Sequence, residues 1–401
     1  MKILIVTPEF WPDRCAANDI ADAFFRAWHD VTVLTGREKS QDSNLEENTE
    51  PLKPPHRDIK IYRTAASPRK NGKPSMTAAL RFGIEGRKLV KSINTKFDAV
   101  MAYEPLITCE AWPAVEAAEA SRAPLALRLS ELWPDRLEAA GASGGITKLA
   151  VKRSGGIYAH SDAIIAASMG FIDRLRAYGY EGPIAYIPKW VEGIENIVPE
   201  YPSDTETHPL PEGFRIVYIG GIGEAQSWDT VLSAAKLLKE SGVDEVKWVL
   251  IGDGSARAGL EQRVLQEGLD SIVFKDMDKT SHVPFWLATA SAALVTFKRK
   301  KEFFLLEPPK IQSYFAHGVP VIASVEGEGA RIVNSARAGV ACEPENPRAL
   351  VDAVMKLYKM DEGERAQLGD NGKAYYGMHY SKMAVVSGIL TTIELLADHE
   401  L

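Results

Sequence analysis

The sequence contains few cysteines and no cluster of metal-ligating residues. Its three cysteines, Cys15, Cys109 and Cys342, lie far apart in a chain of 401 residues. This spacing matches neither a disulfide framework nor a zinc site, and it favours a reducing cytosol as the compartment. The histidines are scattered, and no DxD-type acidic pair follows a predicted strand. We therefore predict no metal requirement and no bound cofactor.

Long apolar runs are also absent. No segment reaches the roughly 18 apolar residues that a membrane-spanning helix needs. The N-terminal segment MKILIVTPEF turns polar too early for a signal peptide. The sequence thus predicts neither a spanning helix nor a secretion signal.

The chain also has no excess of basic residues. The formal net charge is −7 and the isoelectric point is about 5.7, which argues against a general nucleic-acid binder. Hydrophobic residues make up 45% and charged residues 25% of the chain, as in ordinary globular proteins. The length allows two or three domains with cores of their own.

The first half contains short apolar strands that alternate with helices. Predicted strands cover residues 2–7, 31–34, 59–63, 97–101, 124–129, 163–167 and 184–187. Predicted helices cover residues 20–28, 76–94, 148–153 and 169–178, with Asp19 as the N-cap of the first. The first loop lacks glycines, and the polar residues 40–55 indicate a surface loop. This alternation predicts a doubly wound parallel sheet over residues 1–190.

The second half repeats the alternation after a break. Residues 191–213 carry four prolines and several acidic residues, and we interpret them as a linker. Predicted strands follow at residues 215–219, 246–251, 272–274 and 292–297. Predicted helices follow each of the first three strands, and four more are expected near residues 329–335, 347–360, 362–375 and 383–397. A second domain is expected over residues 214–378, and residues 379–401 are a candidate to pack back on the first.

The segment PKIQSYFAHGVPVIAS, residues 309–324, predicts a loop, one short helix, a glycine cap and a buried strand. Pro309 suits the first helical position. Lys310 then lies at a helix N-terminus, where exposed N–H groups and the helix dipole favour an anion such as phosphate. An ordinary helix–strand unit with a surface lysine is the alternative interpretation.

Polar side chains follow two predicted strands of the first half. Glu104 comes after residues 97–101, and SELWPDRL, with Glu131, Trp133 and Asp135, comes after residues 124–129. Ligands bind at the carboxyl ends of parallel strands, so chemistry is expected there. A capped loop with one packing tryptophan is the alternative.

Several segments together resemble a known family. They are IGGIGEAQSWDTVLSAAKLL from Ile219, IGDGSARAGLE from Ile251, the segment 309–324, and GEGARIVNSARAGVACEPENPRAL from Gly327. ILIVTPEFWP, HDVTVLTG and LRLSELWPDRL support the resemblance in the first half. The chain resembles, over nearly its whole length, the retaining nucleotide-sugar-dependent glycosyltransferases of the GT-B fold (family 4-like). The LWP segment resembles the branch that makes bacterial surface polysaccharides, where aminosugar transferases are common.

The resemblance implies an α/β fold of two Rossmann-like domains facing a central cleft. It implies donor-binding residues at Gly220, Gly221, Gly223, Gln226, Gly252, Asp253, Gly254, Arg257, Met277, Glu307, Lys310 and Ser313. Glu131 and Lys310 are the implied catalytic residues, and Glu9, Phe10, Glu104, Trp133 and Asp135 are implied on the acceptor side. In this family the leaving phosphate is thought to take the acceptor proton, so that positioning and electrostatic stabilisation carry catalysis.

The chain departs from the family pattern at several positions. Many members have two glutamates eight positions apart, which fall here on Leu305 and Ser313. Ser313 and the nearby Glu307 are the candidates to replace the second glutamate. The usual arginine and lysine beside the glycine loop fall on Gly221 and Gln226, and Glu131 replaces the usual aspartate of the branch.

Four consecutive cations, residues 298–301, follow a predicted strand and precede EFFLL. One hypothesis is that one or two of them contact the donor diphosphate. A second is that they and the apolar residues contact a membrane bearing a lipid-linked acceptor. The alternative is a solvated charge run.

The expected activity is transfer of a sugar from a nucleotide-diphosphate sugar, UDP-type, to a glycan or lipid-linked acceptor in bacterial polysaccharide or glycoconjugate biosynthesis. The expected location is the cytoplasm, with a peripheral contact at the inner face of the membrane as a further expectation. No nucleic-acid partner is expected. The alternatives are a non-catalytic partner or scaffold protein of the same fold and a nucleotide-sugar epimerase.

Overall fold

The computed structural model describes residues 1–13, 15–37, 58–67, 69–70, 73–191, 194, 210–277 and 282–400. These divide into two compact units. Unit 1 comprises Met1–Lys189 together with Met383–Leu401, and unit 2 comprises Trp190–Lys382. Most of the predicted linker, and the predicted surface loop at residues 40–55, lie outside the described residues.

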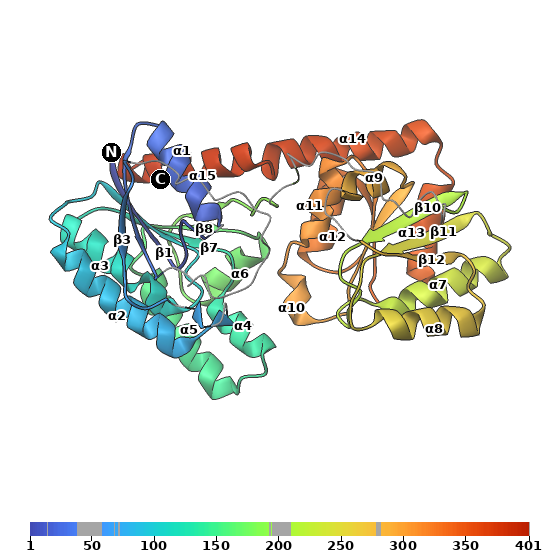
Figure 1. The fold of residues 1–401 in the computed structure, drawn as a ribbon, viewed down its shortest axis with the longest axis horizontal. Coiled ribbons are helices and arrows are strands. Elements are labelled where there is room, and N and C mark those ends of the chain that lie inside the picture. The colour runs from blue at the N-terminus through green and yellow to red at the C-terminus, as the bar shows by residue number, and fades with distance from the viewer. Residues whose placement is uncertain are drawn as a thin grey trace. The chain divides into compact units, whose positions relative to one another are not determined.

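Unit 1 is built on a seven-stranded sheet of order β3-β2-β1-β6-β7-β8-β9 in which every pair is parallel (Figure 1). Its strands are β1 Lys2–Thr7, β2 Asp30–Thr35, β3 Lys60–Arg63, β6 Ala99–Tyr103, β7 Leu125–Leu129, β8 Ala163–Ala166 and β9 Ile184–Tyr186. Its helices are α1 Ala16–Arg26, α2 Met76–Ser92, η1 Thr108–Ala111, α3 Trp112–Ser121, α4 Trp133–Ala139, α5 Gly144–Tyr158 and α6 Gly170–Ala177. A short antiparallel pair, β4 Arg69–Lys70 and β5 Lys73–Pro74, precedes α2.

Unit 2 has a six-stranded parallel sheet of order β12-β11-β10-β13-β14-β15. The strands are β10 Phe214–Ile219, β11 Val246–Ile251, β12 Ile272–Lys275, β13 Ala292–Thr296, β14 Val321–Ser324 and β15 Gly339–Cys342. The helices are α7 Trp228–Glu240, α8 Arg257–Glu267, α9 Val283–Ala288, α10 Lys301–Phe304, α11 Pro309–Ala316, α12 Glu328–Ala336, α13 Pro347–Tyr358 and α14 Glu362–His379, and α15 Lys382–Ala397 follows. Two hydrophobic clusters pack against the sheet of this unit.

The parallel sheets confirm the predicted α/β class, because an apolar strand buried on both faces needs helices above and below it. Several local predictions were wrong. The first helix begins at Ala16 after the N-cap Cys15, so Asp19 lies inside the helix and does not cap it. Helices α3 and α4 and strand β15 were not predicted, and α5 is much longer than residues 148–153.

Gly318 confirms the predicted helix end, because it takes φ +68° directly after the C-cap His317. A side chain disfavours this left-handed backbone, which glycine adopts freely. The strand β14 then follows within three residues. The segment 309–324 therefore has the loop, helix, cap and strand expected of it.

Among the described residues, the stretch Glu362–Ala397 is long and apolar enough to cross a membrane, by length and composition alone. It contains α14 and α15. Tyr376 and Tyr380 belong to a core cluster of unit 2, and Ile389 and Ile393 are fully buried. These four side chains pack inside the protein, and 33% of the most apolar 18-residue window of the stretch is buried.

Candidate functional site

The loop after β10 is held in a fixed conformation by its own neighbours. The N–H of Gly223 donates to Oε1 of Gln226 at 3.0 Å, and the indole N–H of Trp228 donates to the carbonyl of Gly223 at 2.9 Å. The buried Tyr218 hydroxyl donates to the carbonyl of Gly221 at 2.6 Å. In the described part of the chain the N–H of Gly221 has no hydrogen-bond partner, and the residue is exposed. The loop therefore offers a backbone donor to a ligand.

Lys310 lies directly over this loop. Gly220 has φ +131°, and a Cβ added there would stand 2.6 Å from Nζ of Lys310. The ammonium group is 5.2 Å from the centre of the Tyr218 ring, and within the described residues it has no carboxylate partner. Burial lowers the pKa of Lys310. A desolvated cation without a counter-charge, beside a free N–H, is suited to bind an anion.

Helix α11 fixes the position of Lys310 through the residue one turn later. The hydroxyl of Tyr314 accepts from the N–H of Ile219 at 3.2 Å and donates to the carbonyl of Leu294 at 3.4 Å. Because residues four apart lie on the same helix face, this bond ties the face that carries Lys310 to the end of β10. The half-buried Ser313 lies on the same helix, one turn after Lys310.

The turn after β11 packs against the glycine loop. Gly252 also has φ +131°, and a Cβ there would be 2.2 Å from the carbonyl oxygen of Gly220. A Cβ at Gly254 would be 2.4 Å from the carbonyl oxygen of Ile222. Both glycines are therefore needed for the close approach of two backbones. Asp253 is exposed, and its Oδ1 accepts from the N–H of Gly254 at 2.7 Å.

Arg257 supports this turn and already has partners. It donates to the carbonyl of Gly252 at 2.7 Å and to Glu261 at 2.8 Å, and it pairs with Asp276. Its charge is thus compensated inside the unit, so the structure gives it a bracing role and provides no free cation at this position. Met277 is half-buried and packs against the unit 2 core.

Glu307 does not lie open to a ligand. Its side chain is 6% exposed, its Oε2 accepts from the hydroxyl of Tyr380 at 3.0 Å, and its Oε1 lies 3.9 Å from Nη2 of Arg331. This geometry argues against the hypothesis that Glu307 replaces the missing second glutamate. Ser313 therefore remains the candidate to replace the second glutamate, because it occupies that glutamate's position in the sequence and lies one turn after Lys310 on α11.

The four cations at residues 298–301 are not equivalent. The N–H of Lys298 donates to the carbonyl of Ala225 at 2.9 Å, and its Nζ is 3.8 Å from Glu224, next to the glycine loop. Arg299 pairs with Glu343 at 2.6 Å and with Glu326 at 3.0 Å. Of these two residues, Lys298 lies beside the glycine loop and Arg299 does not, so the diphosphate hypothesis favours Lys298 over Arg299. The membrane hypothesis for this loop loses support, because local carboxylates offset the charges of Lys298 and Arg299.

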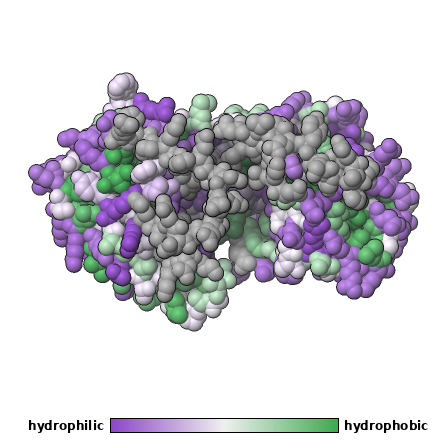
Figure 2. Space-filling view, in the orientation of Figure 1, coloured by the Kyte–Doolittle hydropathy of each residue, from purple (hydrophilic) through white to green (hydrophobic). Residues whose placement is uncertain are grey.

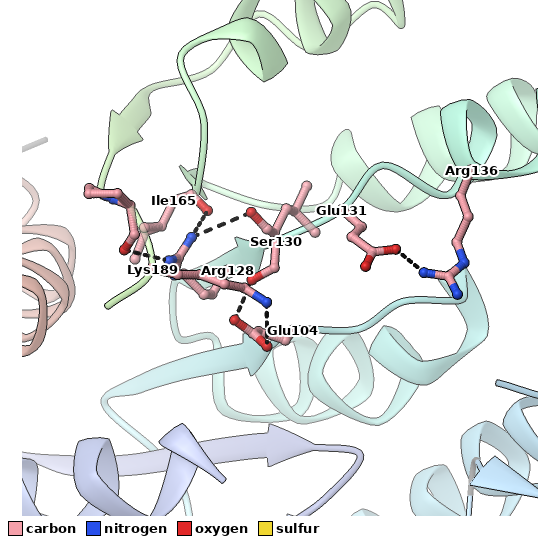
Figure 3. A network of polar contacts seen from close by, with 9 residues as sticks. Glu104, Arg128, Ser130, Glu131, Arg136, Ile165 and Lys189 are labelled. Atoms are coloured by element: carbon pink, nitrogen blue, oxygen red, sulfur yellow. Dashed lines mark hydrogen bonds and ion pairs between the residues drawn. The ribbon is translucent and has the colours of Figure 1, made fainter. Parts of the chain in front are cut away.

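In unit 1, a polar network surrounds Glu104 at the end of β6 (Figure 3). The hydroxyl of Ser130 donates to Glu104, and Nζ of Lys189 lies 3.4 Å from its other oxygen. Arg128 is fully buried in β7 and donates to the carbonyls of Pro188 at 3.0 Å and Ile165 at 3.5 Å. The strand end that carries Ser130 is thereby tied to the segment that carries Lys189.

The other residues predicted on the acceptor side have separate environments. Glu131 pairs with Arg136 and remains partly exposed. Asp135 accepts from Arg174 at 2.7 Å and from the Tyr178 hydroxyl. A pocket of about 10 Å³, the size of one water molecule, is lined by Glu131 and Trp133 among others. Glu131 thus has an accessible carboxylate, whereas Asp135 is engaged in structure.

The first loop of unit 1 corrects one prediction. Phe10 is 1% exposed, so its ring belongs to the core and cannot face an acceptor. Asn18 holds the loop, because its Oδ1 accepts from the N–H of Trp11 at 2.8 Å and its Nδ2 donates to the carbonyl of Asp13 at 2.9 Å. Glu9 is half-buried beside these residues. Among the described residues no group of three His, Cys, Asp or Glu side chains is placed to hold a metal ion.

Comparisons with known proteins find similarity to glycosyltransferases. Residues 213–360 match the family model of the glycosyl transferases group 1. The putative colanic acid biosynthesis glycosyl transferase WcaI of Escherichia coli (strain K12) is 28% identical over 149 residues, 36% of this chain and 36% of that protein. The match thus spans about a third of the relative's length.

Solved structures match the whole fold. Sucrose-phosphate synthase from Thermosynechococcus elongatus superposes with a TM-score of 0.68 at 14% identity, over 100% of both chains. Anabaena HepE in complex with UDP-glucose superposes with a TM-score of 0.61 at 17% identity, over 98% of this chain and 99% of that one. These superpositions confirm the predicted GT-B fold.

Proposed function

We propose that this chain, whose residues 213–360 match the family model of the glycosyl transferases group 1 and whose fold is the GT-B fold, transfers a sugar with retention of configuration from a UDP-type donor to a glycan or lipid-linked acceptor. The family match and the colanic acid relative support a role in bacterial polysaccharide or glycoconjugate biosynthesis. The LWP segment supports the aminosugar transferase branch. The solved complexes of HepE with UDP and UDP-glucose support the choice of nucleotide.

One observation carries the proposal: the ammonium of Lys310 lies over Gly220 without a counter-charge among the described residues. The exposed N–H of Gly221 lies in the same loop. A diphosphate bound there would receive a cation and a backbone donor, and a helix N-terminus adds a favourable dipole. These groups stabilise the negative charge that grows on a leaving diphosphate.

The chemical step balances without a protein base. The bond between the anomeric carbon and the phosphate oxygen breaks, and its electron pair leaves with the nucleoside diphosphate. The acceptor hydroxyl oxygen forms a new bond to the anomeric carbon on the same face, and its proton passes to the departing phosphate oxygen. Lys310 stabilises the leaving group, and the accessible carboxylate of Glu131 is proposed to orient the sugar or the acceptor.

We place the protein in the cytoplasm, peripheral to the inner face of the membrane, where a lipid-linked acceptor would be reached. All three cysteines are free in the structure, which supports a reducing compartment.

A donor panel tests the function. Purified protein is incubated with UDP-, GDP-, TDP- and CMP-linked sugars and a lipid-linked glycan acceptor, with product detected by mass spectrometry. Transfer with release of UDP supports the proposal. Turnover with none of these donors, together with no thermal stabilisation by any nucleotide, contradicts it.

A second candidate is a nucleotide-binding partner protein without turnover. The observation that favours it is the serine at position 313 together with the buried, engaged carboxylate of Glu307. Stabilisation by UDP without transfer to any acceptor would select this candidate.

A further inference from the structure

One side chain, Tyr218, contacts both groups that the proposed donor site offers to an anion. Tyr218 lies near the end of β10 and is 1% exposed. Its hydroxyl donates to the carbonyl of Gly221 at 2.6 Å, and the ammonium of Lys310 lies over its ring, 5.2 Å from the ring centre. The backbone donor and the cation thus share one support in the core.

The hydroxyl of Tyr218 fixes one peptide group of the glycine loop. The carbonyl of Gly221 accepts from this hydroxyl, and the N–H of the next residue, Ile222, donates to the carbonyl of Asp253 at 2.8 Å. Both polar atoms of that peptide are thereby held. The N–H of Gly221, on the preceding peptide, remains without a partner in the described part of the chain.

The ring of Tyr218 is itself held in place. The indole of Trp228 meets it edge to face, with ring centres 4.9 Å apart, and the indole N–H donates to the carbonyl of Gly223 at 2.9 Å. The two buried aromatic residues therefore draw two carbonyls of the loop, those of Gly221 and Gly223, toward the core. Burial raises the pKa of the Tyr218 phenol, so its hydroxyl remains a donor at neutral pH.

The same ring accounts for the position of a buried cation. Hydrophilic side chains line the right-hand edge of the space-filling view, which belongs to unit 2 (Figure 2), and water solvates the charges there. Lys310 is different, because burial lowers its pKa and no carboxylate among the described residues is paired with it. The face of an aromatic ring attracts an ammonium group electrostatically, and more strongly where water is excluded. Tyr218 therefore stabilises the charge of Lys310 without neutralising it.

We propose that Tyr218 is a positioning residue of the donor site, which holds the N–H of Gly221 and the ammonium of Lys310 at a fixed separation for the donor diphosphate. A carboxylate in its place would pair with Lys310 and compete with the ligand, whereas a ring holds the cation and leaves its charge available. An ordinary core tyrosine is the alternative, and for it the two contacts would have no effect on binding. The inference rests on the proposed function, but its first test needs no ligand.

Hydrogen exchange of the ligand-free protein tests the contact with the loop. Tyr218→Phe removes the phenolic oxygen and keeps the ring, so the peptide after Gly221 loses one of its two anchors. We expect the amide of Ile222 to exchange roughly 2- to 12-fold faster, from the usual net contribution of one hydrogen bond. The matched control is Tyr358→Phe, which makes the same change on a half-buried ring of unit 2 whose hydroxyl has no partner among the described residues, and it should leave this exchange unchanged.

Binding of UDP, measured by titration calorimetry, tests the contact with Lys310. Tyr218→Leu removes the ring as well as the hydroxyl, so it should bind UDP more weakly than Tyr218→Phe, by roughly 2- to 30-fold for a desolvated cation–π contact. In a Lys310→Met background the two substitutions should bind UDP equally, because the ring then has no cation to hold. A purely structural role of the ring would keep the difference in both backgrounds. A circular dichroism melt shows that each variant is folded at the assay temperature.

Three results would overturn the inference. The first is an Ile222 amide that exchanges at the wild-type rate in Tyr218→Phe. The second is a wild type that binds UDP while Tyr218→Phe and Tyr218→Leu bind it with the same Kd as the wild type, which leaves the proposed function intact. The third is a difference between the two variants that persists in full in the Lys310→Met background. A wild type that binds no nucleotide would instead refute the proposed function, whereas faster exchange of Ile222 in Tyr218→Phe would still support the hold of Tyr218 on the loop.

Discussion

Replacement of Lys310 by methionine should change stability and ligand binding in opposite directions. Burial lowers the pKa of Lys310, and no carboxylate of the described chain compensates its charge. In the absence of ligand, the ammonium therefore opposes folding. Methionine keeps much of the shape of the side chain and removes the charge, so Lys310→Met should raise the Tm of the ligand-free protein.

The pH dependence follows from the same shift. Because the pKa is lowered in the folded state, the unfolded chain binds the proton more readily between the lowered pKa and the ordinary lysine value of 10.5. The wild type should gain stability as the pH rises through this window. The difference in Tm between Lys310→Met and the wild type should therefore shrink toward alkaline pH.

The effect on binding can be bounded. A hydrogen bond to a charged group contributes about 1.5–3 kcal/mol, so the variant should bind UDP roughly 10- to 100-fold more weakly. UDP at about a hundred times the wild-type Kd stabilises the wild type by about 2.7 kcal/mol, and the same concentration stabilises the variant by only about 0.4–1.4 kcal/mol. At about 2–4 °C per kcal/mol for a unit of this size, the ligand-induced Tm shift falls from roughly 5–10 °C to roughly 1–5 °C.

Thermal unfolding with and without UDP measures both effects, and titration calorimetry gives Kd directly. Lys236→Met is the matched control, because Lys236 is exposed on α7 in the same unit and has no partner among the described residues. The control should alter neither the Tm nor the UDP-induced shift by much. A Lys310→Met protein that is less stable than the wild type, or that binds UDP with unchanged Kd, would refute the reasoning about this lysine.

Three further variants test the supporting structure. Gly252→Ala should destabilise unit 2 by about 2–4 kcal/mol in urea unfolding, since strain at positive φ adds to a clash with the backbone of Gly220. The control is Gly259→Ala in α8, where an added Cβ meets open space, and it should stabilise the unit by about 0.5–1 kcal/mol. Arg128→Met removes the side-chain donor of three backbone carbonyls and should cost about 1–3 kcal/mol, with unchanged stability counting against the network. Asp361→Ala removes the capping box of α14 and should lower stability by about 0.5–2 kcal/mol, while Asp361→Ser should retain most of it.

The most reliable inferences from the sequence concerned residues whose roles depend on near neighbours. Pro309 and Gly318 bound helix α11 as expected, because a proline at the start and a glycine after the end of a helix act through local backbone geometry. The prediction that Asp19 caps the first helix was wrong. The N-cap is Cys15, although its side chain makes no capping hydrogen bond. Propensity at one position did not decide where that helix starts.

The partners of charged side chains could not be predicted from local sequence patterns. Arg257 was expected to meet the donor, yet it pairs with Asp276, nineteen residues away. Glu307 was expected to replace a missing carboxylate, yet it accepts from Tyr380, 73 residues away. Such pairs depend on which elements become neighbours in the folded chain, and a local sequence pattern does not indicate which elements these are.

Local sequence patterns were enough to predict the two α/β halves, the glycine loop at the end of β10 and the lysine at the start of α11, because apolar periodicity, glycine and proline act over a few residues. The assembled fold was needed to show that Lys310 lies over Gly220 without a counter-charge among the described residues and that the ring of Phe10 is buried. The physical reason is that burial and charge pairing are properties of contacts between residues distant in the chain, and those contacts exist only once the sheets have assembled.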